Sequence, residues 1–261
     1  MNENKTRRKL RAGEAVIGTF CFLPEPAIVE MAGLAGFDFV IIDLEHAGKD
    51  FATIESMVRA AEVRDVTPLV RVSDANEKAI LQLLELGAQG IVAPFLQDGD
   101  TAARLARSVR YPPQGTRGSC RSTRAALYGS RLGDFAGQIR QADENILFAG
   151  MIEDRAGLEN VEAIVASGMD VCFLGRADLS TDLGHPGDLN HPDVVAACAR
   201  VVKAATRAGC AAGNMVFQPS EAAAQVAAGY RFLVCGTDTQ FISRAMQDMV
   251  QGARASLKPA R

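Results

Sequence analysis

Apolar strand-like runs and helix-like segments alternate along the whole chain, and this alternation constrains the fold more than any other feature. The eight runs that we predict to be strands cover residues 15–22, 38–43, 67–72, 90–95, 146–152, 170–175, 210–216 and 231–235. The helices that we predict after them cover residues 25–35, 51–63, 75–86, 101–110, 156–167, 192–208, 219–228 and 238–256. Eight strand–helix units in succession favour a closed parallel barrel over an open doubly wound sheet. We therefore predict an α/β fold that forms one (β/α)8 TIM barrel.

The length of the chain agrees with a single domain. It has 261 residues, and a barrel of this kind typically takes about 250. The regular spacing is interrupted once, between the fourth and fifth predicted strands. There a loop rich in Pro, Gly and Arg, at 111–124, precedes a further helix around 125–141. We interpret 111–141 as an insertion in one domain that spans 1–261, and such insertions usually form a lid or an interface.

Ionisable side chains follow several of the apolar runs. The run FDFVIIDLEH is apolar until it reaches Asp43, and Glu45 and His46 come directly after. The same pattern recurs at Glu153 and at Asp178. Barrel enzymes keep their chemistry at the carboxyl ends of the strands, which lie together at one mouth. The sequence therefore predicts a single polar site there.

Glu153 and Asp178 are the candidate metal ligands. They follow neighbouring predicted strands, and one or two carboxylates with water and substrate oxygens commonly hold Mg²⁺. Each residue taken alone is equally compatible with a helix N-cap or an ion pair at the rim. Because they occur as a pair with Asp43 nearby, the pattern favours a metal site.

Arg71 and His46 are the candidate groups for substrate and proton handling. Arg71 ends the third predicted strand, where a guanidinium can bind a carboxylate through two hydrogen bonds. The alternative is a structural ion pair with Glu45 or Glu153. His46 stands beside two acids and can act as a general base, or it can simply cap or pack.

Two absences narrow the chemistry. None of the six lysines lies in a predicted strand, and only Lys49 is near a strand end, which argues against an aldolase that forms a Schiff base. The glycine-rich phosphate and nucleotide motifs are also absent from the sequence. His185 looks like a loop residue and His191 like a helix start, so we assign neither a role.

The composition excludes several partners. The formal charge of -3 argues against a nucleic-acid partner, because phosphate binding requires a strongly basic face. No apolar segment approaches the length of a transmembrane span, and the charged N-terminal segment lacks the apolar stretch of a signal peptide. The six cysteines are scattered without a CxxC pair. We therefore expect free thiols in a reducing, cytoplasmic setting, with no membrane partner.

Seven segments spread over nearly the whole chain match the motifs of a known family. They are GFDFVIIDLEHAG (36–48), PLVRVS (68–73), LLELGAQGIVAP (83–94), YPPQGTRG (111–118), MIED (151–154), LGRADLSTDLG (174–184) and FLVCGTD (232–238). In these segments the chain resembles the HpcH/HpaI aldolase family. Its members are metal-dependent class II pyruvate aldolases of the phosphoenolpyruvate/pyruvate barrel superfamily.

The resemblance implies a role for each candidate residue. His46 would be the histidine on the side of the base, and Arg71 would contact the pyruvyl group. Glu153 and Asp178 would bind the divalent metal, Mg²⁺, Mn²⁺ or Co²⁺. Asp43 would orient the histidine or a water on the metal.

The resemblance also implies an assembly. Glu85 matches an acid that in relatives reaches the active site of a neighbouring subunit. Relatives are usually hexamers built from dimers that exchange their last helix, so we expect a homo-oligomer, a trimer of dimers, with the C-terminal helix exchanged between subunits.

Two arginines depart from the family pattern. Arg176 follows Gly175, where relatives usually have a small residue or Pro, and Arg121 is an unusual addition to the 117–124 loop. Backbone near Gly175 and Ala177 contacts the substrate carboxylate in relatives. The two arginines therefore either extend the substrate site toward further carboxylates or face solvent or another subunit.

The motifs lead to one main functional hypothesis and two alternatives. The main hypothesis is the reversible cleavage of a 4-hydroxy-2-oxo acid into pyruvate and an aldehyde, through a pyruvate enolate that the metal stabilises. The first alternative is a condensing enzyme of the same fold that joins an acyl-CoA to an oxo acid, as in citrate-forming enzymes of siderophore pathways. The second is a non-catalytic barrel that binds a small acid. The acceptor aldehyde, the stereochemistry and the pathway stay open.

Overall fold

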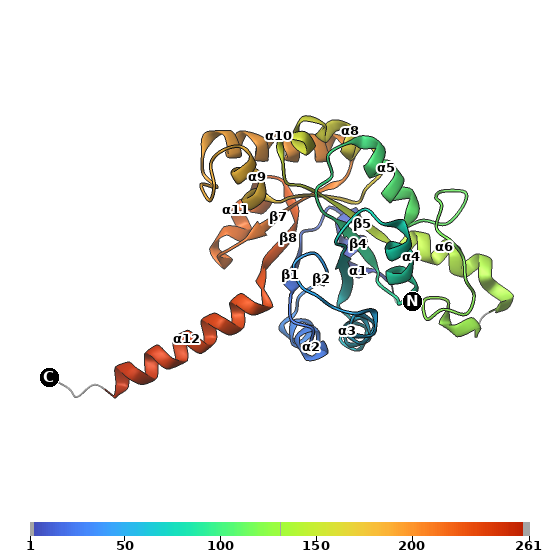
Figure 1. Cartoon of the computed structure of the whole chain (residues 1–261), viewed down its shortest axis with the longest axis horizontal. Helices are drawn as coiled ribbons and strands as arrows, with labels where there is room; N and C mark the ends of the chain where they lie inside the picture. Colours follow the sequence, from blue (N-terminus) through green and yellow to red (C-terminus); the bar gives the residue numbers. More distant parts are fainter. Residues whose placement is uncertain (1–2, 131, 258–261) are drawn as a thin grey trace.

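Eight parallel strands close into a barrel in chain order, as the alternation predicts (Figure 1). The computed structural model describes residues 3–130 and 132–257. Strand β1 pairs with β2 on one side and with β8 on the other, which closes the sheet. The strands are β1 (Val16–Cys21), β2 (Phe39–Asp43), β3 (Thr67–Arg71), β4 (Gly90–Ala93), β5 (Leu147–Ile152), β6 (Val171–Leu174), β7 (Ala211–Val216) and β8 (Tyr230–Thr237).

Helices surround the barrel and occupy most of the predicted ranges. They are α1 (Lys5–Arg11), α2 (Pro26–Ala35), α3 (Phe51–Val63), α4 (Glu77–Glu85), α5 (Gly99–Ser108), α6 (Phe135–Asn145), α7 (Arg155–Glu159), α8 (Val161–Val165), α9 (Arg176–Asp182), α10 (Pro192–Ala208), α11 (Ala222–Ala227) and α12 (Asp238–Ser256). Short 3-10 turns cover Leu127–Gly129, Leu132–Asp134 and Pro219–Glu221. No described helix has the length and apolar character needed to cross a membrane.

The helices differ from the prediction in four places. The predicted helix at 156–167 is two helices that meet at Asn160. The helix expected around 125–141 begins only at Phe135, where Asp134 caps it. The helices α1 and α9 are additional. Asn4 starts α1 by accepting a hydrogen bond from the Arg7 N–H, which is the usual capping geometry.

Aromatic rings fill the inside of the barrel. Phe39 and Phe232 stack with their ring centroids 4.1 Å apart, and Phe173 meets Phe232 edge to face at 6.2 Å. Gly18 permits this packing, because a Cβ built there would lie 2.2 Å from the Phe39 ring. A second apolar cluster fills the space between the strands and the surrounding helices. The barrel is thus a packed core rather than a pore.

The two ends of the chain lie in different environments. Helix α1 packs under the N-terminal end of the barrel, where Thr6 donates a hydrogen bond to the hydroxyl of Thr67 (2.8 Å). Helix α12, in contrast, extends away from the barrel (Figure 1). Its outer positions carry exposed apolar side chains, including Met246 and Met249.

Candidate active site

The strand alternation that fills the barrel also places the polar residues of its mouth. Successive side chains of a strand point to opposite faces, and Ile41, Leu69 and Met151 belong to the inner cluster. Two positions further along their segments stand Asp43, Arg71 and Glu153. These three residues therefore continue the inward-facing rows at the C-terminal end of the barrel. This is the end at which we predicted the site.

Asp43 and Arg71 form a buried ion pair across neighbouring strands. They are register partners in β2 and β3, and Arg71 Nε donates to Asp43 Oδ1 at 2.6 Å. Arg71 Nη1 lies 3.0 Å from Glu45 Oε2. The Arg71 guanidinium also lies 4.7 Å above the ring of Phe20, the top of the aromatic core. These contacts hold the guanidinium in one position. The sequence left open whether Arg71 forms a structural ion pair with Glu45. The structure shows this ion pair, and the guanidinium group still lies at the candidate site.

Asp43 also shapes the loop that carries His46. Its carboxylate accepts the backbone N–H groups of Glu45 (3.2 Å) and His46 (3.1 Å). The Lys49 ammonium donates to the carbonyl oxygens of Phe22 (2.9 Å) and Asp43 (2.7 Å). Lys49 therefore fastens the loop to β1, which fits a structural role rather than Schiff-base chemistry.

The imidazole of His46 is accessible at the mouth of the barrel. Its side chain is 58% exposed, and Nε2 lies 3.7 Å from Glu45 Oε2. The described contact between Asp43 and His46 runs through the backbone N–H, so Asp43 positions the histidine through its loop. An exposed imidazole beside a carboxylate can accept a proton from a substrate hydroxyl.

Glu153 is buried and has few partners. Its Oε2 accepts the Phe95 N–H at 3.0 Å. Burial raises its pKa to about 7; the Phe95 hydrogen bond opposes this shift, and the charges of Glu45 and Asp178 add to it. Gly175 gives the side chain its room, because a Cβ at that position would lie 2.5 Å from Glu153 Cγ.

The excess of carboxylates fits a hard divalent cation. Burial raises the pKa of Glu45, and the charges of Asp43 and Asp178 raise it further against the effect of Arg71. Glu45 Oε2 is buried and lies within ion-pair distance of Arg71, but it accepts no hydrogen bond from the described residues. A cation with oxygen ligands would offset this repulsion. Glu153 and the exposed Asp178, in the first turn of α9, are the residues that fit its ligands.

The two unusual arginines lie outside this cluster. Arg176 Nη2 is 3.5 Å from the Met215 carbonyl, and the guanidinium faces the ring of Phe217 at 5.9 Å. Ala177, next to it in α9, is exposed. The guanidinium of Arg121 stacks over Phe135 at 4.7 Å. The described contacts of Arg121 are therefore with the insertion rather than with the cluster.

Glu85 lies at the far end of α4 from the site of its own chain. It borders a separate cavity of about 380 Å³ together with Arg124 and Tyr128. That Glu85 contributes to the active site of a neighbouring subunit stays a prediction.

The remaining two histidines form their own cluster. The rings of His185 and His191 stack with centroids 3.3 Å apart, and both face Asp193. Among the described residues, this is the place where three potential metal-ligating side chains lie within 4.8 Å of one another. However, His191 Nδ1 accepts the Asp193 N–H (3.3 Å) and caps α10. This agrees with the helix start that we predicted at His191.

One contributor to the site was missed from the sequence, and another was named there only as an alternative. Glu45 was the alternative ion-pair partner of Arg71, and the structure shows that pair. Phe20 was predicted only as a strand residue. It has the correct alternation with Gly18, but its contact with Arg71 joins separate strands and has no local signal.

Comparisons with known proteins agree with this geometry. The family model described as HpcH/HpaI aldolase/citrate lyase matches residues 17–245. A pyruvate aldolase of Rhizobium etli is 35% identical over 245 residues, which are 94% of this chain and 95% of that protein. A 5-keto-4-deoxy-D-glucarate aldolase of Klebsiella pneumoniae is 33% identical over 247 residues, with 94% and 95% covered.

Solved structures show the same likeness. A HpcH/HpaI aldolase/citrate lyase family protein from Burkholderia cenocepacia has a TM-score of 0.89 and 32% identity, with 96% of this chain and 99% of that chain covered. The citrate synthase SbnG has a TM-score of 0.86 and 27% identity, with 96% and 97% covered.

Proposed function

Because the chain belongs to the HpcH/HpaI aldolase/citrate lyase family, we propose that it is an aldolase that cleaves a 4-hydroxy-2-oxo acid to pyruvate and an aldehyde. The observation that carries this proposal is the cluster at the barrel mouth. There the rigidly held Arg71 lies among Asp43, Glu45 and Glu153, with the accessible His46 beside them.

The family is generally dependent on a divalent metal, and the surplus of carboxylates fits one. Glu153 and Asp178 would hold it, and the bound cation supplies Lewis-acid stabilisation for the negative charge that develops on the pyruvyl half. Mg²⁺, Mn²⁺ and Co²⁺ are the candidates. Gly175 serves this arrangement by leaving the space that the Glu153 side chain occupies.

Arg71 adds a fixed positive charge for the pyruvyl half. Its Nε is used by Asp43 and its Nη1 faces Glu45, so the guanidinium is oriented before substrate arrives. A preorganised cation at a site shielded from water stabilises developing negative charge more than a mobile one does. In the cleavage direction that charge arises as the C3–C4 bond breaks and its electron pair passes to the pyruvate enolate.

His46 handles the proton of the reacting hydroxyl. In cleavage its imidazole accepts the proton from the C4 hydroxyl as the new aldehyde forms, and in condensation it returns that proton. Glu45, 3.7 Å from the imidazole, would stabilise the protonated ring. The enolate takes up a proton at C3 to give pyruvate.

Pyruvate release from a panel of 4-hydroxy-2-oxo acids tests the proposal. We expect release after EDTA treatment only when Mg²⁺, Mn²⁺ or Co²⁺ is restored. The panel includes 5-keto-4-deoxy-D-glucarate, because a relative is named for that substrate. No release from any acid in the presence of the metals would contradict the aldolase proposal.

An acyl-CoA condensing activity is the second candidate. The half-buried Arg176 has an Nε without a hydrogen-bond partner among the described residues, and it lies at the rim beside the cluster, where a further carboxylate could bind. The likeness to a citrate synthase supports the same reading. Thiol release from acetyl-CoA with oxaloacetate would separate this activity from a simple aldolase.

The described surface of α12 supports an oligomer. Its Met246 is 65% and its Met249 73% exposed, and Met31 and Leu34 of the neighbouring α2 are 60% and 70% exposed. Apolar side chains at this density are typical of an interface. We expect α12 to pack on a second subunit, within the trimer of dimers. Light scattering should show a smaller particle for a Met246→Arg/Met249→Arg variant; an unchanged mass would contradict the exchanged helix.

A further inference from the structure

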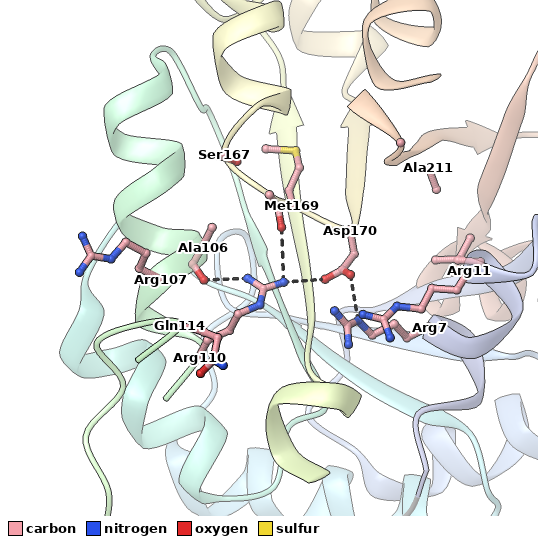
Figure 2. Close-up of a pocket in the computed structure, with 13 residues that line it drawn as sticks. Arg7, Arg11, Ala106, Arg107, Arg110, Gln114, Ser167, Met169, Asp170 and Ala211 are labelled. Atoms are coloured by element: carbon pink, nitrogen blue, oxygen red, sulfur yellow. Dashed lines mark hydrogen bonds and ion pairs between the residues drawn. The ribbon is translucent and has the colours of Figure 1, made fainter. Parts of the chain in front are cut away.

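A basic cavity lies at the end of the barrel opposite the active site. Its volume is about 510 Å³, and Figure 2 shows the residues that line it. They come from α1, from the end of α5, from the turn between α8 and β6, and from the start of β7. Since β6 begins at Val171 and β7 at Ala211, this cavity faces the N-terminal ends of the strands. It therefore shares no lining residue with the aldolase site.

Three guanidinium groups gather there around one carboxylate. Asp170 Oδ1 lies 2.8 Å from Arg7 Nε, and Asp170 Oδ2 lies 3.3 Å from Arg110 Nη2. Oδ2 also accepts the Phe148 N–H at 3.0 Å. Figure 2 shows the guanidinium of Arg11 beside that of Arg7. These contacts use both oxygens of Asp170. Asp170 is the one carboxylate among the lining residues, so the three guanidinium groups carry more positive charge than it balances.

Arg11 is the guanidinium without a counter-charge. It is exposed at the edge of the cavity, and it forms no ion pair in the part of the chain that the structure describes. Burial lowers the pKa of Arg7, and the charges of Arg11 and Arg110 lower it further against the opposing effect of Asp170. Asp143 lies outside the lining but its charge also acts on Arg7 and Arg110, so the three guanidinium groups exceed the carboxylates near them by one positive charge. A fourth arginine, Arg107, lines the same cavity but points away from this group (Figure 2).

A hydroxyl group without a partner lines the same cavity. Ser167 Oγ is buried and has no hydrogen-bond partner among the described residues. A hydroxyl can donate to an anionic oxygen, and a buried polar group without a partner is destabilising. Figure 2 shows Ser167 on the far side of Met169 from Arg11, so the surplus positive charge is the feature that an oxyanion would balance.

We propose that this cavity binds a multivalent oxyanion, a phosphate group or a polycarboxylate. Guanidinium groups bind both kinds of anion through paired hydrogen bonds. The anion would contact Arg11 at the edge of the cavity and would balance the charge that Asp170 leaves over. Because Arg7 and Arg11 belong to α1 while Arg110 follows α5, the bound anion would fasten α1 to the base of the barrel. The proposal does not depend on the reaction at the other end.

Calorimetric titration and thermal unfolding with inorganic phosphate, and separately with citrate, test this site. Both series are run at constant ionic strength on metal-free protein, because citrate chelates Mg²⁺, and each is repeated with saturating pyruvate. We expect saturable binding and a Tm that rises with the anion concentration. The anion that binds more tightly identifies the source, phosphate or polycarboxylate. Absence of binding for both anions, or their displacement by pyruvate, would overturn the proposal.

The test variant and its control lie on the same helix. Arg11→Gln should weaken binding about tenfold, the loss expected for one charge-assisted pair. Arg8→Gln removes the same charge from α1, but Arg8 pairs with Glu3 and does not line the cavity, so binding should stay unchanged. Equal losses for Arg8→Gln and Arg11→Gln would show a general charge effect and sink the site.

Discussion

The two ends of the barrel carry opposite surpluses of charge on the same set of strands. At the C-terminal end, Asp43, Glu45, Glu153 and Asp178 outnumber the single guanidinium of Arg71. At the N-terminal end, Arg7, Arg11 and Arg110 outnumber the carboxylate of Asp170. In both places one charged side chain pairs with two of the opposite sign, and further like charges are left without an ion-pair partner.

The comparison shows that a buried ion pair and a surplus of like charge have different effects on a site. A buried pair such as Asp43–Arg71 contributes little net stability, but breaking it is costly, so it fixes geometry. The surplus beside it raises the free energy of the empty site and favours an exchangeable ion of the opposite sign. The carboxylates at one end would therefore select a divalent cation, and the guanidinium groups at the other end an oxyanion.

The largest expected effect comes from reducing the surplus at the C-terminal end. Glu153→Gln and Asp178→Asn should each abolish metal binding, because the neutral side chains are weaker ligands for a hard cation. Activity should fall by at least about a thousandfold, since a bound metal contributes several kcal/mol to such reactions. Calorimetry with Mn²⁺ and the pyruvate assay measure both quantities. Glu162→Gln, on the surface of α8, is the matched control, and retained metal affinity in both site variants would refute the ligand assignment.

His46→Ala should impair proton transfer without changing the surplus of negative charge that would bind the metal. The imidazole adds no carboxylate ligand, so the affinity for Mn²⁺ should stay unchanged. The kcat should fall by about 10²–10⁴, the usual contribution of a positioned acid–base group. His185→Ala removes a histidine from the other cluster and serves as the control. Full activity of the His46 variant would show that another group accepts the proton.

At the opposite end, Asp170→Asn should sharpen the comparison by increasing the surplus of positive charge. Arg7 and Arg110 would lose their counter-charge in a partly buried cavity, which should lower the free energy of unfolding by about 3 kcal/mol. Phosphate should then stabilise the variant more than the wild type. Asp65→Asn removes the exposed partner of Lys5, also on α1, and should cost about 1 kcal/mol or less. Urea unfolding of the two variants measures both free energies. Equal losses of unfolding free energy would contradict the claim that Asp170 compensates buried positive charge.

The sequence predicted the strands and the polar residues at their ends, but little of what depends on contacts between distant parts of the chain. All eight strands lie within two residues of the predicted ends, because continuous apolar runs are typical of strands buried on both faces. The same alternation placed Asp43, Arg71 and Glu153 together. Helix α9 was missed because its N-cap is Gly175, which makes no side-chain capping bond. The basic cavity was missed because Arg7 and Asp170 are 163 positions apart, and no local pattern connects them.

The smallest expected effect is the pH dependence of the metal-free protein. Burial raises the pKa of Glu153 from 4.5 to about 7, so the folded state holds this proton more tightly than the unfolded chain does. The stabilisation from the protonated form is complete below pH 4.5 and is lost as the pH rises through 7. The sign is the reverse of that for a carboxylate in an ion pair, and the loss should be about 2–3 kcal/mol. Urea unfolding in EDTA measures it. Glu153→Gln should flatten the curve between these pH values, and saturating Mn²⁺ should oppose the loss in the wild type because a cation favours the ionised carboxylate. A wild-type curve that rises over this range, or an unchanged slope in the variant, would show that the carboxylates at the mouth of the barrel are already compensated without a metal.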